Sequence, residues 1–448
     1  MNIYLITFSF SALIQPVKSE SSIFNLQSSI FNLQSSLFII ESPLMLTLII
    51  LILIVGYNFE VVLDYLNIKN WSEKVPEKVS DFYSKEKYQK ARSYSLVNYW
   101  FSTVSSLISF IIMLVALIMG FFGWLDEYIR QFTDSPIWIA ILFFGIIGLG
   151  SDLISMPFSL YKTFVIEEKF GFNKTTVKTF IIDKLKGYVL SILIGGGIIA
   201  LLVKVFQITG SNFWWIAWLF FTCLMLVVTM FYTSWILPLF NKLTPLPVGD
   251  LRTAIEDYSK KNKFPLKDIF VMDGSRRSTK ANAFFSGLGR KKKIVLYDTL
   301  IKEHSTDELV AVLAHETGHF QLKHTRTGFI AGIIQTGIML FLFSLLQGNL
   351  SLTEAMGAKM PGLHLELFAF ALLYTPVSLV TGIIMHIISR KHEFEADAFA
   401  KKTFDGRALI AALKKLSADN LSNLTPHPAY VFFHYSHPPL LKRIESLE

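Results

Sequence analysis

The residues with the clearest chemical signature form the sequence His-Glu-Thr-Gly-His at positions 315–319. They belong to an apolar-periodic stretch that predicts a helix over residues 307–324, and helical residues four apart share one face. His315 and His319 can therefore bind one Zn²⁺, while Glu316 lies beside them to activate a water molecule. The pattern indicates metal-assisted hydrolysis of a peptide bond.

A catalytic zinc ion takes three protein ligands and keeps one position open for water. A second predicted helix carries Glu393 and Asp397 four residues apart. This spacing makes Glu393 the candidate third ligand. It also lets Asp397 accept a hydrogen bond from the outer nitrogen of a ligating histidine. We expect His392 and Glu395 to face solvent, and His324 to lie near the membrane surface.

Two further segments suit a peptidase. Asn282 opens a predicted strand that is expected to lie at a sheet edge, where an extended peptide can pair by strand addition. Asn282 could then hold the substrate backbone. His437 precedes two prolines and can donate a hydrogen bond to the oxyanion of a tetrahedral intermediate. Each segment alone also fits ordinary loop chemistry.

The composition places these residues in a membrane protein. The chain has 448 residues, of which 52% are hydrophobic and 17% charged, whereas soluble proteins carry about 25% charged residues. Its 40 Phe and 8 Trp exclude a disordered chain. The single cysteine, Cys223, excludes an intramolecular disulfide and a thiolate metal site.

Apolar segments near the length needed to cross a bilayer predict seven membrane-spanning helices. They cover residues 44–63, 101–124, 137–156, 188–206, 214–239, 329–346 and 367–388. Loops rich in Lys and Arg alternate with loops that are poor in them. By the positive-inside rule the N-terminus lies outside, and both long polar segments, 245–326 and 389–448, lie in the cytoplasm. The net charge of +8 then reflects orientation in the membrane, and nucleic acid is not an expected partner.

We divide the chain into three parts. Residues 1–43 contain the repeat SSIFNLQ and are expected to be a non-functional extension, with Met45 as the expected translation start. Residues 44–244 form a membrane domain with five spans. Residues 245–448 form a zinc peptidase domain, which the last two spans interrupt. Its expected elements are a helix over 251–261, strands over 268–272, 282–288 and 292–297, the helix over 307–324, and a helix that ends at 402.

From about residue 45 to its end, the chain resembles the integral-membrane CAAX prenyl protease family of zinc metallopeptidases. The resemblance rests on several motifs together. They are FVIEEKFGFN (164–173), LFNKLTPLP (239–247), GSRRS (274–278), HETGH (315–319), EFEAD (393–397) and HYSHPPLL (434–441).

The resemblance implies seven membrane helices around an internal chamber, with a small α+β zincin-type domain on the cytoplasmic side. It implies zinc ligands at His315, His319 and Glu393 and a catalytic Glu316. It further implies supporting or substrate-contacting roles for the residues Asp397, Asn282, His437 and Arg443. The implied substrate is a prenylated Cys-aliphatic-aliphatic-X peptide, cut after the modified cysteine.

The predicted function is thus a membrane-embedded zinc endopeptidase with one Zn²⁺ per chain. We expect a lipidated peptide or protein substrate, contact with membrane lipid and a monomeric state. The expected location is the inner membrane of a bacterium or the endoplasmic reticulum of a eukaryote. One alternative is a quality-control protease that needs no prenyl group. A remote alternative is a transporter with a structural zinc site, suggested by Asp152 inside the third span.

Overall fold

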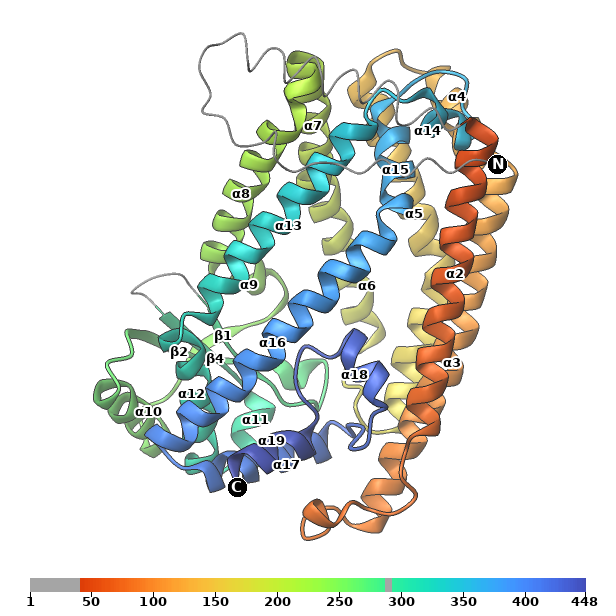
Figure 1. Cartoon of the computed structure of the whole chain (residues 1–448). Coiled ribbons are helices and arrows are strands. Elements are labelled where there is room, and N and C mark those ends of the chain that lie inside the picture. The colour runs from red at the N-terminus through yellow and green to blue at the C-terminus, as the bar shows by residue number, and fades with distance from the viewer. Residues whose placement is uncertain (1–40, 287–291) are drawn as a thin grey trace, which may run out of the picture.

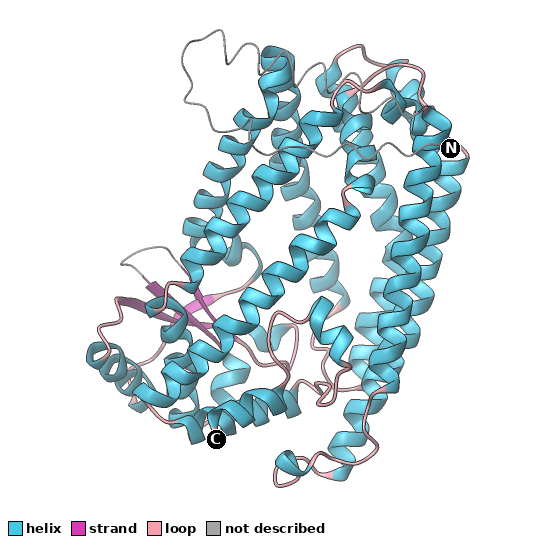
Figure 2. Ribbon diagram, viewed as in Figure 1, coloured by secondary structure: helices cyan, strands magenta, loops and turns pink. Residues whose placement is uncertain are grey.

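The computed structural model describes residues 41–286 and 292–448. Long helices stand side by side, and a small sheet with shorter helices lies at one end, near the C-terminus (Figures 1 and 2). The predicted mostly helical membrane architecture with a small α+β part is confirmed. The SSIFNLQ repeat lies outside the described residues.

Six helices in the described part are long and apolar enough to cross a membrane, and a bent pair makes a seventh candidate. They are α2 (Ser42–Lys69), α3 (Lys85–Ile118), α5 (Pro136–Tyr161) with a π-helical extension (Lys162–Glu167), α6 (Val177–Leu190) with α7 (Gly196–Thr209), α8 (Phe213–Phe231) with α9 (Leu237–Phe240), α13 (His324–Leu346), and the pair α15 (Leu363–Leu373) and α16 (Thr375–Thr403). The pair bends by 56° beside Pro376, which lacks the N–H that would continue the helix. Each predicted span overlaps one of these helices or the bent pair. The enclosed chamber stays a prediction.

Four strands form one sheet in the order β1-β2-β4-β3. They are β1 (Leu243–Pro245), β2 (Leu266–Met272), β3 (Ala283–Ser286) and β4 (Lys292–Tyr297). The strand β2 runs parallel to β4, while β1 and β3 pair antiparallel with their neighbours. The three predicted strands are confirmed within the described residues, and the predicted end of the strand over 282–288 lies outside them. The strand β3 lies at an edge as expected, and the short strand β1 was not predicted.

Shorter helices complete the structure. They are α4 (Phe121–Arg130), α10 (Asp250–Lys261), α11 (Asp298–Glu303), α12 (Thr306–Gln321), α14 (Leu350–Ala355), α17 (Gly406–Asp419), α18 (Pro428–His434) and α19 (Leu440–Leu447). One hydrophobic cluster joins α10, the sheet, α12 and α17, and it includes Ile255, Ile294, Val310 and Leu409. This core anchors α12, which carries the His-Glu-Thr-Gly-His sequence, against the sheet.

The helices α16 and α12, which carry the two candidate metal-binding motifs, differ in whether they continue into a membrane span. The helix α16 runs from its span to Thr403 without interruption, as predicted. The helix α12 ends at Gln321, so the predicted helix over 307–324 is three residues too long. The reason is Lys323, whose φ of 63° lies in the left-handed region and turns the chain before α13 begins at His324.

A clasp segment (residues 273–282) fastens the peptidase part to the first five spans. Lys280 donates hydrogen bonds of 3.0 Å to Glu167 and to the hydroxyl of Tyr94. Arg277 donates two hydrogen bonds to Asp183 on α6. Since β3 follows the clasp directly, these contacts fix the edge strand relative to the membrane helices.

Candidate metal centre

The helix α12 begins with a capping box between Ser305 and Glu308, which satisfies backbone donors at its N-terminus. Its apolar residues face the hydrophobic core, so His315 and His319 project from the opposite surface toward α16. Their Nε2 atoms lie 3.1 Å apart. The helical spacing thus brings two imidazoles together as the sequence predicted.

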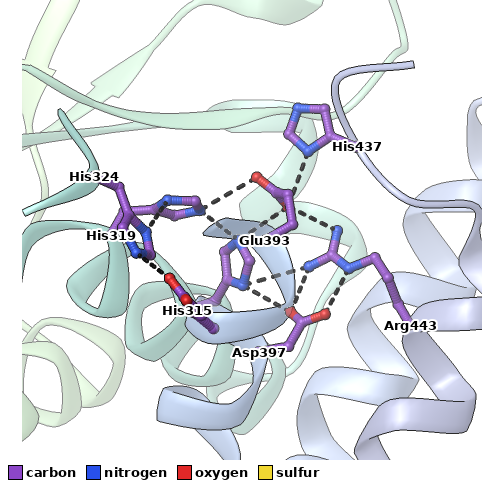
Figure 3. Close-up of polar contacts among 8 residues, drawn as sticks. His315, His319, His324, Glu393, Asp397, His437 and Arg443 are labelled. Atoms are coloured by element: carbon purple, nitrogen blue, oxygen red, sulfur yellow. Dashed lines mark hydrogen bonds and ion pairs between the residues drawn. The ribbon is translucent and has the colours of Figure 1, made fainter. Parts of the chain in front are cut away.

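The helix α16 supplies the third candidate ligand, Glu393, which is buried. One carboxylate oxygen lies 3.5 Å from His315 Nε2, and the other lies 3.3 Å from His319 Nε2 (Figure 3). A tetrahedral Zn²⁺ with bonds of about 2.0–2.1 Å separates its ligand atoms by about 3.3–3.4 Å. The separation of the two imidazole nitrogens and the two contacts of Glu393, which end on different carboxylate oxygens, all lie close to this value, and the three residues form a group that could hold a metal ion.

Asp397 lies behind His315, one helical turn beyond Glu393. Its carboxylate is 2.8 Å from Nδ1 of His315, the nitrogen that faces away from Glu393. Arg443 on α19 donates two hydrogen bonds to the same carboxylate, at 2.6 and 2.8 Å. The bidentate pair holds Asp397 in place, so Asp397 can fix the orientation of the His315 ring.

The carboxylates make the site favourable for positive charge. Burial alone would lower the pKa of His315, but its contacts with Asp397 and Glu393 raise that pKa to about 9. Burial likewise opposes the charge of Arg443, yet Asp397 and Glu393 raise its pKa above the usual value. The same negative environment suits a metal cation between the three ligand atoms.

Arg443 also approaches Glu393, at 3.4 Å, and is itself buried. These contacts favour a supporting role for Arg443 over the predicted contact with substrate.

Glu316 lies at the wall of a cleft of about 410 Å³ beside the ligand cluster. His319, Glu393 and His437 line the same cleft. Its remaining wall is largely apolar, with Phe264, Phe284, Phe320, Met385 and Ile388 among the lining residues. The cleft therefore combines a candidate metal centre and a carboxylate base with apolar surface for substrate side chains.

His437 reaches the cluster from the loop between α18 and α19. Its Nδ1 atom lies 2.9 Å from Glu393, and its side chain is 65% exposed. A residue that the sequence analysis passed over holds this loop: Arg390 on α16 donates hydrogen bonds to the backbone carbonyls of Val431, at 3.0 Å, and Tyr435, at 2.6 Å. A cation suits the C-terminus of a helix, and here it ties α18 to the helix that carries Glu393.

Gly318, between the two histidines, was also missed. A Cβ atom at this position would lie 3.0 Å from the Cα of Ala396 and 3.1 Å from the Cβ of Phe399, both on α16. Only a glycine lets α12 and α16 approach this closely. The glycine in the motif was visible in the sequence, but its neighbour on another helix was not.

Three expectations about neighbouring residues are wrong or incomplete. His324, the first residue of the candidate span α13, is buried within the protein, with its Nδ1 atom 3.1 Å from Nδ1 of His319, and its place near the membrane surface stays a prediction. Its Nε2 atom is 2.9 Å from Glu395, and its ring stacks on His392. Glu395 and His392 therefore both contact His324 and do not simply face solvent, although the side chain of Glu395 is still 42% exposed.

Asn282 lies outside the metal-ligand cluster. It is exposed at the start of the edge strand β3, where its Oδ1 atom accepts a hydrogen bond from the backbone of Ala283. Among the described residues it has no hydrogen bond to the metal-ligand cluster. Its predicted contact with substrate stays a prediction.

Comparisons with known proteins give the family of the chain. Residues 64–242 match the family model described as CAAX prenyl protease N-terminal, five membrane helices, and residues 245–448 match peptidase family M48. A CAAX prenyl protease 1 homolog from Arabidopsis thaliana is 36% identical over 88% of this chain and 96% of its own. CAAX prenyl protease 1 from Saccharomyces cerevisiae is 35% identical over 88% and 93%.

A solved structure is also similar. The crystal structure of S. mikatae Ste24p superposes with a TM-score of 0.85 at 35% identity, covering 90% of this chain and 99% of that one. Both the fold and the sequence of that solved chain are thus matched over 90% of this chain. The chain belongs to peptidase family M48 and carries that family's CAAX prenyl protease N-terminal region with its membrane helices.

Proposed function

We propose that this protein is a zinc endopeptidase that removes the C-terminal tripeptide from prenylated CAAX-type substrates. The main support for this proposal is the ligand set of His315, His319 and Glu393, whose side-chain nitrogen and oxygen atoms gather in one place beside a cleft that Glu316 also lines. The substrate class is supported by relatives named CAAX prenyl protease 1 that match most of this chain.

The proposed reaction divides the work among the residues of the cleft. When bound, zinc supplies Lewis acidity that polarises the scissile carbonyl and lowers the pKa of water. Glu316 takes the proton from the attacking water and later returns it to the leaving amine. His437 donates a hydrogen bond to the oxyanion as it develops. Asp397 holds His315 in the ring orientation that binds the metal, and Arg443 holds Asp397.

The edge strand and the apolar wall suit the substrate. An extended peptide can pair with β3, whose outer edge has no neighbouring strand among the described residues. In this proposal, Asn282 at the start of the strand holds the substrate backbone. Phe284, on the same strand, lines the cleft and offers an apolar contact for aliphatic side chains.

The test compares two peptides that differ only in a farnesyl group on the cysteine. The full-length protein in detergent should bind one zinc per chain and cleave the farnesylated peptide after the cysteine. Glu316→Gln should keep the zinc and lose about 10²–10⁴-fold in turnover, because the general base is gone. Undiminished cleavage by this variant would refute the mechanism.

Equal cleavage of both peptides would instead support a quality-control protease without a prenyl requirement. The transporter alternative has less support. Asp152 on α5 accepts hydrogen bonds from Lys184 and Tyr188 on α6, so this intramembrane charge is already paired within the protein. We further propose that the zinc site faces the cytoplasm and that the protein acts as a monomer. The membrane would be the endoplasmic reticulum of a eukaryote or the inner membrane of a bacterium.

A further inference from the structure

The two candidate histidine ligands have different partners on their outer nitrogens. His315 Nδ1 meets the carboxylate of Asp397 at 2.8 Å. His319 Nδ1 instead meets another imidazole, Nδ1 of His324, at 3.1 Å. The opposite nitrogen of His324, Nε2, lies 2.9 Å from a carboxylate oxygen of Glu395. A series of hydrogen bonds, called the relay below, therefore runs from His319 through His324 to Glu395. Figure 3 shows its first contact, between His319 and His324.

We propose that His324 and Glu395 are positioning residues, which hold His319 in the tautomer and ring orientation needed for metal binding. The proton positions follow from the geometry. A metal ion on Nε2 of His319 requires the proton of that ring on Nδ1, where it donates to Nδ1 of His324. His324 must then carry its own proton on Nε2, where it donates to Glu395. Each imidazole nitrogen of His319 and His324 thus acts as a metal ligand, a hydrogen-bond donor or a hydrogen-bond acceptor, and both imidazoles are neutral.

The fold supports this assignment. Lys323, in the left-handed conformation, ends one helix and begins the next, which brings His324 back toward a residue five positions earlier. Glu395 lies two residues beyond Glu393 on α16, so the same helix supplies both a candidate metal ligand and the end of the relay. His324 is 6% exposed, which limits competition from water at its own nitrogens, while the carboxylate of Glu395 at the end of the relay is partly exposed.

The same residues also form, with His392, a group whose atoms are close enough to suggest a second metal ion. The ring geometry argues against that reading. The rings of His324 and His392 stack with centroids 3.9 Å apart and planes only 7° from parallel. Because the lone pairs of imidazole nitrogens lie in the ring plane, those of two stacked rings run side by side and do not converge on one ion. His392 therefore packs on the relay without belonging to it.

The inference rests on the proposed zinc peptidase function, but its test measures zinc binding instead of activity. Zinc dissociation constants come from chelator competition with the full-length protein in detergent, and zinc stoichiometry from elemental analysis. His324→Phe keeps the ring that stacks on His392 and removes both nitrogens. We expect its zinc dissociation constant to rise about 10–100-fold.

Two substitutions at the far end of the relay are matched. Glu395→Gln keeps an acceptor oxygen and should bind zinc within about twofold of the wild type. Glu395→Leu removes the acceptor and should weaken zinc binding at least threefold. The control His392→Phe keeps the stack and should leave zinc affinity unchanged. All variants should bind one zinc per chain.

Several results would overturn the relay. Wild-type zinc affinity in His324→Phe would do so, as would a lower melting temperature of its zinc-free form without a change in affinity. Loss of a second zinc ion in His392→Phe would show that the cluster is a metal site. Failure of the proposed function is distinguishable, because a wild-type protein that binds zinc but cuts no peptide would leave these affinity differences intact.

Discussion

Gly318→Ala tests whether the close approach of α12 and α16 sets the geometry of the metal centre. The added Cβ would lie 3.0 Å from the Cα of Ala396, whereas ordinary contacts begin at 3.4 Å. The neighbour is backbone and cannot rotate away, so α16 must move outward by about 0.4–1 Å to reach ordinary contact distance. Glu393 lies on α16 one turn before this contact and would move with it.

The substitution has two opposing effects on the free energy of unfolding. Alanine favours a helix over glycine by about 1 kcal/mol, while overpacking costs about 1–3 kcal/mol. We therefore expect only a small loss of stability. Metal affinity should respond more strongly, because ligand distances tolerate shifts of only about 0.2 Å. A displaced Glu393 should raise the zinc dissociation constant roughly tenfold, which corresponds to about 1.4 kcal/mol.

The assay is chelator competition on full-length protein, with thermal unfolding of the zinc-free form measured in parallel. Gly382→Ala is the matched control. It lies on α16, and apart from the adjoining backbone of its own helix no described atom lies within 4 Å of the added Cβ, so it changes helix propensity without a new steric contact. Wild-type zinc affinity and wild-type peptide cleavage in Gly318→Ala would refute the reasoning, since the helices would then accommodate the methyl group without moving Glu393.

Two further variants test positioning contacts outside the ligand set. Arg390→Met removes the hydrogen bonds that tie α18 to α16 and should lower kcat about tenfold with zinc affinity unchanged, because His437 loses its fixed position. Lys280→Met breaks the clasp and leaves Glu167 without its cation. The loss of two charge-assisted hydrogen bonds, partly screened by solvent, should destabilise the protein by about 1–2 kcal/mol, measured as a lower melting temperature.

Each of these variants has a neighbouring control. Lys391→Met removes an exposed charge next to Arg390 and should leave kcat at the wild-type value. Equal losses of kcat in Arg390→Met and Lys391→Met would mean that kcat depends on the positive charge of this segment and not on the contact with α18. Lys267→Met removes an exposed lysine of the same domain. If it lowers the melting temperature as much as Lys280→Met does, the clasp contributes nothing specific.

Much of the candidate site was predictable because helical periodicity is local. The four-residue spacing alone placed His315 with His319, and Glu393 with Asp397, on common helix faces. Hydropathy likewise located the spans, since each helix must satisfy its own backbone in lipid. Such inferences fail where a single residue breaks the local rule. Lys323 ends α12 early through its left-handed conformation, and neither periodicity nor hydropathy marks that turn.

Patterns along the sequence were therefore enough to predict the membrane class, the approximate spans, the candidate ligands and Glu316. Three contacts became known only from how the helices pack: the relay from His319 through His324, the close approach at Gly318, and the hydrogen bonds from Arg390 to the loop of His437. The physical reason is the same for all three. Which face of a helix a residue occupies depends on its own segment, but which partner that face meets depends on how separate helices pack.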